Sequence, residues 1–343
     1  KVTEKKANEN NLKFENKLQR FYYIVPLYFA LGLYYNKKDK DSSEKYFHLA
    51  NKETFNNIRY DSFSYQKKIL KLIDVYEKHN LDQISSEFEK GKSNIFIVGS
   101  PRSGTTLTES IVTANDDVFS AGELISAGDI ISRKLDSEKL EISELRSQFQ
   151  EDYTRRTNFL KSNFQFITDK LPENFLYIGH ILNFLPDAKI IRVFRDPWDT
   201  AISLYKQRYL MNIPFSASFF NIGVFMANFE AINLYWNKKI VSKNNILDVR
   251  YEDLVENKDL NQKRIYSFLN FTSDYQEKKR QEFFSNTASI QQVQGSIHKS
   301  SVGKKEFDDK KNEFYEAINM QREFWVSKGI IEKPKDFFGY NLV

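Results

Sequence analysis

The chain has 343 residues, of which 41% are hydrophobic and 28% charged, so its composition predicts a packed globular protein rather than a disordered one. Its net charge of +5 is small beside 51 basic and 46 acidic residues, which argues against a nucleic-acid-binding protein. The absence of cysteine excludes disulfides, thiolate metal sites and cysteine nucleophiles, and it fits a reducing, cytoplasmic location.

The first 90 residues contain only helical patterns. The apolar stretch 21–35, FYYIVPLYFALGLYY, is too short to span a membrane, so we expect no transmembrane segment. A polar turn, NKKDKDSS, separates it from a second amphipathic stretch through Phe47, and this arrangement predicts a helical hairpin that partly matches the tetratricopeptide (TPR) pattern. We therefore predict a TPR-like, all-helical region at 1–90 and a catalytic domain at 91–343.

Beyond residue 93, short apolar runs alternate with amphipathic helical patterns. The runs with the length and composition of buried strands are 94–99, 164–169, 188–196 and 245–253. The helical patterns between them are 174–184, 198–210 and 218–240. In the third run, Lys189 and Arg192 are expected near the ends of the strand. This alternation predicts an α/β fold, with a parallel sheet flanked by helices.

The segment VGSPRSGTTL, residues 98–107, is a glycine-rich turn between the first predicted strand and a helix. Such P-loop-type turns direct backbone N–H groups at an anion, and the helix dipole adds positive charge. The lysine that nucleoside triphosphatases place in this loop is replaced by a threonine, whereas Arg102 stands inside the loop. A single 5′-phosphate beside a less charged sulfuryl group suits it better than a triphosphate with its metal. The predicted contacts are Ser100, Pro101, Arg102, Ser103, Gly104, Thr105 and Thr106.

A second anion-binding pattern is RVFRDPWDTAIS, residues 192–203. Arg195 is expected at the carboxyl end of a strand, and Ser203 follows eight positions later on a helix. A strand-end guanidinium and a helix-borne hydroxyl can converge on one phosphate, which the arginine can bind with two hydrogen bonds. We expect this pair to bind a ribose 3′-phosphate.

Together these stretches resemble the sulfotransferase superfamily, which uses 3′-phosphoadenosine 5′-phosphosulfate (PAPS). SPRSGTTL is similar to the 5′-phosphosulfate loop of the family, and RVFRDPWDTAIS is similar to its 3′-phosphate motif. VRYEDLVEN, residues 249–257, is similar to a third stretch, whose tyrosine (Tyr251 here) packs near the adenine. The resemblance covers about 93–330. It implies a PAPS-dependent sulfotransferase that releases 3′,5′-bisphosphoadenosine (PAP) and needs no metal.

Within the superfamily, the chain is similar to the branch of tyrosylprotein sulfotransferases and bacterial tetratricopeptide-repeat sulfotransferases. FSAGELISAGDII places Glu123 at the spacing of the catalytic glutamate of that branch, and ITDKLPENF places Lys170 at its catalytic lysine. The resemblance implies that Glu123 is the general base for the acceptor hydroxyl. It also implies that Lys170 and Arg102 stabilise charge during in-line transfer.

The late segment TASIQQVQGSIHKSSVGK, residues 287–304, is similar to the loop that closes over the cofactor in this branch. It departs from the family pattern, because Gln294 stands where relatives often carry a basic residue. We expect Lys299 or Lys304 to supply that charge. The implied cofactor contacts in this loop are Ser289, Lys299 and Lys304.

Several alternatives stay open at this stage. Glu123 can be a carboxylate at a helix N-terminus, Lys170 a surface lysine, and Tyr251 a core residue. The whole protein can also be a P-loop kinase or nucleotide phosphotransferase, or an interaction module on an inactive transferase domain. The acceptor can be a peptide tyrosine, a glycan or a small alcohol or phenol, and relatives make a homodimer plausible. The four scattered histidines have no ligand spacing, so no metal is implied.

Overall fold

The computed structural model describes residues 17–79, 81, 93–135, 142–161, 163–209, 213–240, 243–272, 275–282 and 302–340. The chain divides into two compact units. The helical unit holds the described parts of 1–65, 196–228 and 303–343, and the sheet unit holds those of 66–195 and 229–302. The predicted boundary at residue 90 lies outside the described residues, so the division at that point stays a prediction.

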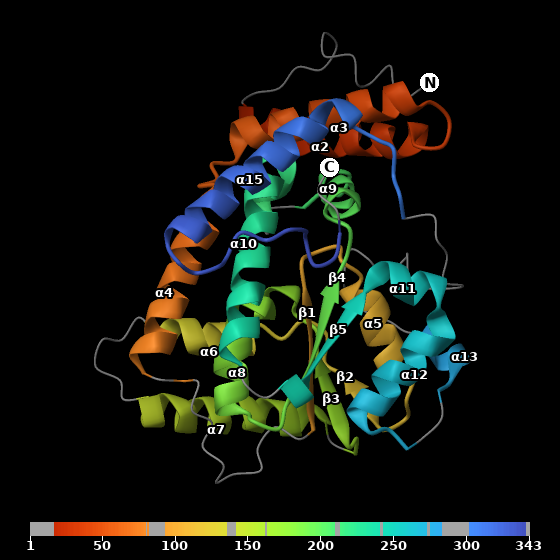
Figure 1. The fold of residues 1–343 in the computed structure, drawn as a ribbon. Helices are drawn as coiled ribbons and strands as arrows, with labels where there is room; N and C mark the ends of the chain where they lie inside the picture. The colour runs from red at the N-terminus through yellow and green to blue at the C-terminus, as the bar shows by residue number, and fades with distance from the viewer. Residues whose placement is uncertain are drawn as a thin grey trace. The chain divides into compact units, whose positions relative to one another are not determined.

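The sheet unit is built on five strands in the spatial order β2-β3-β1-β4-β5 (Figure 1). Every neighbouring pair is parallel, as the sequence predicted. The edge strand β2 escaped prediction because three residues are too few to show a pattern. The strands are β1 (Asn94–Gly99), β2 (Val118–Ser120), β3 (Phe166–Asp169), β4 (Lys189–Phe194) and β5 (Ile246–Arg250).

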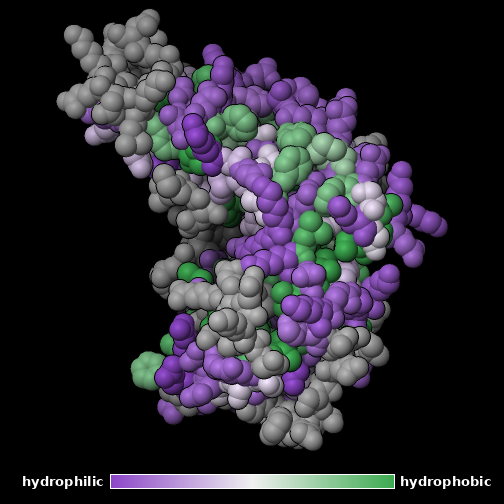
Figure 2. Space-filling view, turned by 90° about the vertical axis from the view of Figure 1, so that its left-hand side faces the viewer, coloured by the Kyte–Doolittle hydropathy of each residue, from purple (hydrophilic) through white to green (hydrophobic). Residues whose placement is uncertain are grey.

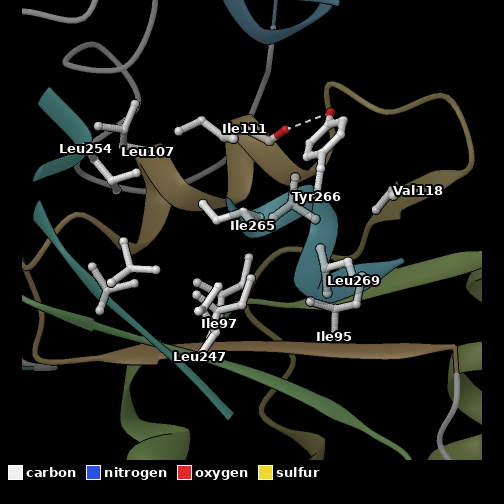
Figure 3. Packing of buried hydrophobic residues seen from close by; sticks show 14 of the residues in the cluster. Ile95, Ile97, Leu107, Ile111, Val118, Leu247, Leu254, Ile265, Tyr266 and Leu269 are labelled. Carbon is white, nitrogen blue, oxygen red and sulfur yellow. Dashed lines mark hydrogen bonds between the residues drawn. The ribbon is translucent and has the colours of Figure 1, made fainter. Parts of the chain in front are cut away.

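Helices cover both faces of this sheet, which is why its central strands are apolar on both sides. Ile95 and Ile97 of β1 point into a cluster with residues of α5, α11 and α12, shown in Figure 3. Phe96, on the opposite face, stacks on Tyr153 of α7 with 5.5 Å between the ring centroids. The helices of this unit are α4 (Ser64–Lys78, all but its first two residues), α5 (Thr105–Val112), α6 (Ser126–Leu135), α7 (Ile142–Lys161), η2 (Pro172–Tyr177), α8 (Ile178–Phe184), η4 (Lys243–Asn245), α11 (Tyr251–Glu256), α12 (Lys258–Leu269) and α13 (Glu277–Gln281).

Arg192 lies in the middle of β4, so the prediction that places it near the end of a strand is wrong. Its side chain is buried and donates to Asp248 of β5 through Nε (2.7 Å) and Nη2 (2.8 Å). The two residues are partners in the register of β4 and β5, so their side chains leave the same face of the sheet. This two-point ion pair offsets the cost of burying the guanidinium. Lys189, in contrast, does begin the strand.

The helical unit contains the predicted helical hairpin. Asp39 caps the second helix, because its carboxylate accepts a hydrogen bond from the N–H of Ser42. Gly32 lets the two helices approach, since a Cβ there would lie 3.0 Å from the ring of Phe47. One hairpin does not establish a repeat, so the TPR assignment stays a prediction. The elements of this unit are α2 (Lys17–Tyr35), α3 (Lys40–Asn57), α9 (Pro197–Tyr205), η3 (Pro214–Ala217), η5 (Asp308–Lys310), α15 (Lys311–Ser327) and the first half of α10 (Phe219–Lys239).

Polar contacts join α15 to the first half of α10. Gln321 and Trp325 each donate to the side-chain oxygen of Asn228 at 2.9 Å.

On the face shown in Figure 2, hydrophilic side chains cover most of the described surface and hydrophobic groups lie in smaller areas between them. None of the described helices has both the length and the apolar character needed to cross a membrane.

Candidate functional site

The predicted site residues of the sheet unit follow the carboxyl ends of all five strands. Parallel strands end at the same edge of a sheet, so these residues succeed one another in the order of the strands. Neighbouring strands lie about 4.8 Å apart, so the row extends over about 19 Å. Ligands of open α/β sheets bind outside this edge. In strand order the row is Glu123 (after β2), Lys170 (after β3), residues 100–106 (after β1), Arg195 (after β4) and Tyr251 (after β5).

The loop between β1 and α5 has the backbone of an anion-binding turn. Gly104 is the N-cap of α5 with φ +104°, and Arg102 also has a left-handed φ of +70°. The N–H of Ser103 closes the turn by donating to the carbonyl of Ser100 at 3.1 Å. Gly104 has no side chain with which to cap α5, and an uncapped helix N-terminus attracts an anion.

The start of this loop has room for glycine alone. A Cβ on Gly99 would lie 2.6 Å from both the carbonyl oxygen of Val193 and the hydroxyl of Ser103. That hydroxyl oxygen is buried and has no hydrogen-bond partner in the part of the chain that the structure describes. Buried polar groups rarely stay unpaired, so the loop presents a donor for a ligand.

Arg195 connects the loop to the neighbouring strand end. Its Nη1 donates to the carbonyl oxygen of Arg102 at 2.9 Å, and its guanidinium carbon lies 4.6 Å from the centroid of the Tyr251 ring. The same ring packs against Gly104, where a Cβ would lie 2.5 Å from Cδ2. Tyr251 also packs on the core cluster of the sheet. The core interpretation of Tyr251 thus has direct support, and its contact with adenine stays a prediction.

Ser203 lies on α9 in the helical unit and is buried. In the first turn of that helix, the carboxylate of Asp199 accepts the backbone N–H of Lys304 at 2.8 Å. Arg195 and Ser203 belong to different units, so the joint 3′-phosphate site stays a prediction. Of the other late-loop contacts, Ser289 and Lys299 lie outside the described residues.

Glu123 and Lys170 form an ion pair with 2.9 Å between Oε1 and Nζ. The Lys170 side chain is 0% exposed, so the alternative of a surface lysine is wrong, whereas Glu123 is 44% exposed. The backbone joins the same two segments, because the N–H of Lys170 donates to the carbonyl of Gly122 at 2.9 Å. The ion pair therefore has a buried cation and a carboxylate that solvent can reach.

Glu109 of α5 completes this group, although no motif singled it out. Its carboxylate is fully buried, and Oε1 accepts hydrogen bonds from Ser120 (2.9 Å) and Thr168 (3.0 Å). The other oxygen, Oε2, lies 3.9 Å from Nζ of Lys170. Burial raises the pKa of the Glu109 carboxyl, while Lys170 and the two hydroxyls oppose that rise. The one available signal was a glutamate inside the otherwise uncharged helix segment TTLTESIV.

Asp169, beside Lys170 in the chain, is a further buried acid. It accepts hydrogen bonds from the hydroxyl of Tyr153 at 2.8 Å and from the amide of Asn174 at 3.3 Å. Burial raises the pKa of Asp169 to about 7. Among the described residues, no group of three or more histidine, aspartate or glutamate side chains could hold a metal ion.

Residues 94–275 match the model of a family described as the sulfotransferase family. An uncharacterized protein of Aquifex aeolicus is 30% identical over 290 residues, which are 78% of this chain and 38% of that protein. Sulfotransferase 6B1 of Mus musculus is 30% identical over 165 residues, which are 45% of this chain and 52% of that protein. The chain thus spans at most about half the length of these curated relatives.

Two solved structures are similar at lower identity. The sulfotransferase domain from the olefin synthase of Synechococcus PCC 7002 has a TM-score of 0.46 at 17% identity, covering 69% of this chain and 98% of that one. Sulfotransferase STF9 from Mycobacterium avium has a TM-score of 0.43 at 11% identity, covering 96% of this chain and 95% of that one.

Proposed function

Because this chain belongs to the sulfotransferase family, we propose that it transfers a sulfuryl group from PAPS to the hydroxyl of an acceptor. The observation that carries the proposal is the loop at 100–106. It has the turn of a phosphate-binding loop without the lysine, and Arg195 from the next strand end donates to the carbonyl oxygen of Arg102. Arg195 thus binds to the loop that carries Arg102, at the edge where such sheets bind ligands.

The loop fits the 5′-phosphosulfate of PAPS in three respects. Ser103 offers a buried hydroxyl whose oxygen has no partner in the described chain, Gly104 leaves the N-terminus of α5 uncapped, and Arg102 supplies positive charge. When bound, PAPS supplies an activated sulfuryl group and leaves as PAP. We propose that Arg195 and Ser203 hold the 3′-phosphate, that Tyr251 packs near the adenine, and that the late loop contributes further contacts. Those further contacts are Ser289, Lys299 and Lys304.

The residues of this chain divide the chemistry between them. The exposed carboxylate of Glu123 takes the proton of the acceptor hydroxyl as the oxygen–sulfur bond forms. Lys170 orients that carboxylate through the ion pair, and its own charge stabilises the negative charge of the transferring group together with Arg102. The buried position of Lys170 keeps water from screening its field.

Isothermal titration tests the nucleotide assignment. We expect tight binding of PAP without Mg²⁺, and weaker binding of ATP whether or not Mg²⁺ is present. A Mg²⁺-dependent preference for ATP would instead establish a kinase or nucleotide phosphotransferase.

A screen with radiolabelled PAPS tests the reaction and identifies the acceptor class. The acceptors to include are tyrosine peptides, glycans and small phenols or alcohols, with Glu123→Gln as the matched variant. We expect transfer by the wild type and its loss in the variant. Equal turnover of the two proteins would remove the base assignment. PAP binding with no transfer to any acceptor would point to an inactive interaction module.

Sedimentation of the same protein tests the proposed homodimer.

A further inference from the structure

A fully buried carboxylate stands beside the proposed catalytic pair. Oε1 of Glu109 is occupied by the hydroxyls of Ser120 and Thr168, while Oε2 has no hydrogen-bond partner among the described residues. The ammonium of Lys170 lies 3.9 Å from that second oxygen. Burying a carboxylate costs several kcal/mol unless it is paired, so its position needs a physical reason.

The two carboxylates around Lys170 differ in their surroundings. Glu109 is sealed from solvent by the protein, and Glu123 is 44% exposed at the edge of the sheet. An ammonium that is itself 0% exposed has lost its hydration, which costs several kcal/mol unless negative charge compensates it. Glu123 alone is a weak compensator, because water screens a half-exposed carboxylate. The buried carboxylate supplies compensation that solvent cannot screen.

We infer that Glu109 is a positioning residue of the active site, which acts through Lys170 to keep the Glu123 carboxylate oriented for proton transfer. This inference rests on the proposed sulfotransferase function. The charged groups that act on this cluster are Lys170, Glu123 and Asp169. Among the described residues, the side chain of Glu109 contacts Ser120, Thr168 and Lys170, and of these only Lys170 is paired with Glu123, so its effect on Glu123 passes through the lysine.

The location of Glu109 gives this contact a second consequence. Glu109 lies on α5, the helix that begins at Gly104 of the phosphate-binding loop. Its hydrogen-bond donors, Ser120 and Thr168, belong to β2 and β3, the strands that lead to Glu123 and Lys170. One side chain therefore connects the helix of the nucleotide loop to the two strands of the proposed catalytic pair.

The test uses Glu109→Gln, which keeps an oxygen for Ser120 and Thr168 but removes the charge. With radiolabelled PAPS and para-nitrophenol as the acceptor, we expect kcat to fall about tenfold to 100-fold, the size of effect that a misplaced catalytic group produces. The affinity for PAP should stay within about twofold, because the loop itself is unchanged.

A double variant and a matched control separate positioning from stability. Glu109→Gln with Glu123→Gln should be no slower than Glu123→Gln alone, because the positioned group is already gone. Glu77→Gln, which breaks an ion pair between Glu77 and Lys239 of the same unit, should leave kcat unchanged. An unchanged kcat in Glu109→Gln, or additive losses in the double variant, would overturn the inference.

A further readout does not depend on turnover. The ammonium signal of Lys170 in nitrogen-15 NMR, identified by its absence in Lys170→Arg, should change its chemical shift in Glu109→Gln but not in Glu77→Gln, because only the first variant removes the neighbouring carboxylate charge. If the wild type transfers no sulfuryl group while this shift is seen, the proposed function fails and the coupling of Glu109 to Lys170 stands. If transfer occurs without the shift, the inference fails and the function stands. Should Glu109→Gln not fold, Thr168→Val keeps the charge and removes one of the two donors to Oε1 of Glu109. This variant should lower kcat by about two- to tenfold, and no change would count against the inference.

Discussion

Replacing Lys170 with methionine removes the only cation described within 4.0 Å of the buried Glu109 carboxylate. Methionine has nearly the same length, so the packing is kept and the change is mainly one of charge. Both side chains of this inner pair are 0% exposed, and breaking such a pair costs about 3–5 kcal/mol. The ion pair between Lys170 and Glu123 adds at most about 1 kcal/mol, because Glu123 is half exposed. We therefore expect the free energy of unfolding to fall by about 3–5 kcal/mol at neutral pH.

The loss should depend on pH in a direction that the structure sets. Burial raises the folded-state pKa of Glu109 above its usual value of 4.5. This group therefore contributes stability to the folded protein below pH 4.5, and that contribution is lost as pH rises. Without Lys170 the pKa of Glu109 rises further, because its carboxylate has lost its cationic partner. Lys170→Met should thus be most destabilised in alkaline solution and least in acid. Adding Glu109→Gln should restore about 2 kcal/mol, because no buried charge is then left unpaired.

Urea unfolding followed by circular dichroism measures the free energy of unfolding of each protein at about pH 5 and about pH 8. The four proteins are the wild type, the two single variants and the double variant. A loss below about 1 kcal/mol in Lys170→Met at the higher pH would show that the inner pair is not a real interaction. Equal losses at the two pH values, or additive effects in the double variant, would refute the charge argument itself.

Three further changes test other parts of the site. Arg102→Gly should weaken PAP binding at least about tenfold. The urea midpoint should stay equal or rise, because glycine relieves about 1 kcal/mol of backbone strain at a φ of +70°. A lower midpoint would contradict this prediction. Arg195→Lys should raise the Kd for PAP about tenfold to 100-fold, since lysine loses the planar contact with Tyr251 and the bond to the loop carbonyl; titration that finds equal affinity would oppose it. Asp169→Asn should abolish the part of the pH dependence of stability that comes from this group. The pKa of Asp169 is raised from 3.8 to about 7, so the wild type gains stability from Asp169 below pH 3.8 and loses that stability as pH rises through about 7. If urea midpoints of the two proteins decline in parallel over that range, the explanation is wrong.

The sequence predicted the sheet well because its strands are buried on both faces. Runs such as NIFIVG leave little doubt about a parallel strand, and a glycine-rich turn after one identifies the edge at which a ligand binds. The edge strand β2 carries no such run. Arg192 was misplaced because a charged residue suggests a strand end until its partner is known, and that partner, Asp248, is 56 residues away.

The same limit explains why Glu109 escaped notice. Its hydrogen-bond partners lie on β2 and β3, and Thr168 is 59 residues away in the chain. Local patterns report which groups a segment carries, but not which distant group faces them. Glu123 and Lys170 were found by resemblance to a family, and their mutual ion pair came only from the structure.

The row of strand ends separates the proposed catalytic pair from the proposed nucleotide contacts. Glu123 and Lys170 follow β2 and β3 at one margin of the sheet, while Arg195 and Tyr251 follow β4 and β5 at the other. Under the proposed assignment, substitutions around the first margin would change the acceptor preference and leave the nucleotide contacts of the second margin in place. Under the same assignment, a chimaera that takes residues 118–135 from a related protein would acquire the acceptor preference of that relative and keep its own nucleotide site.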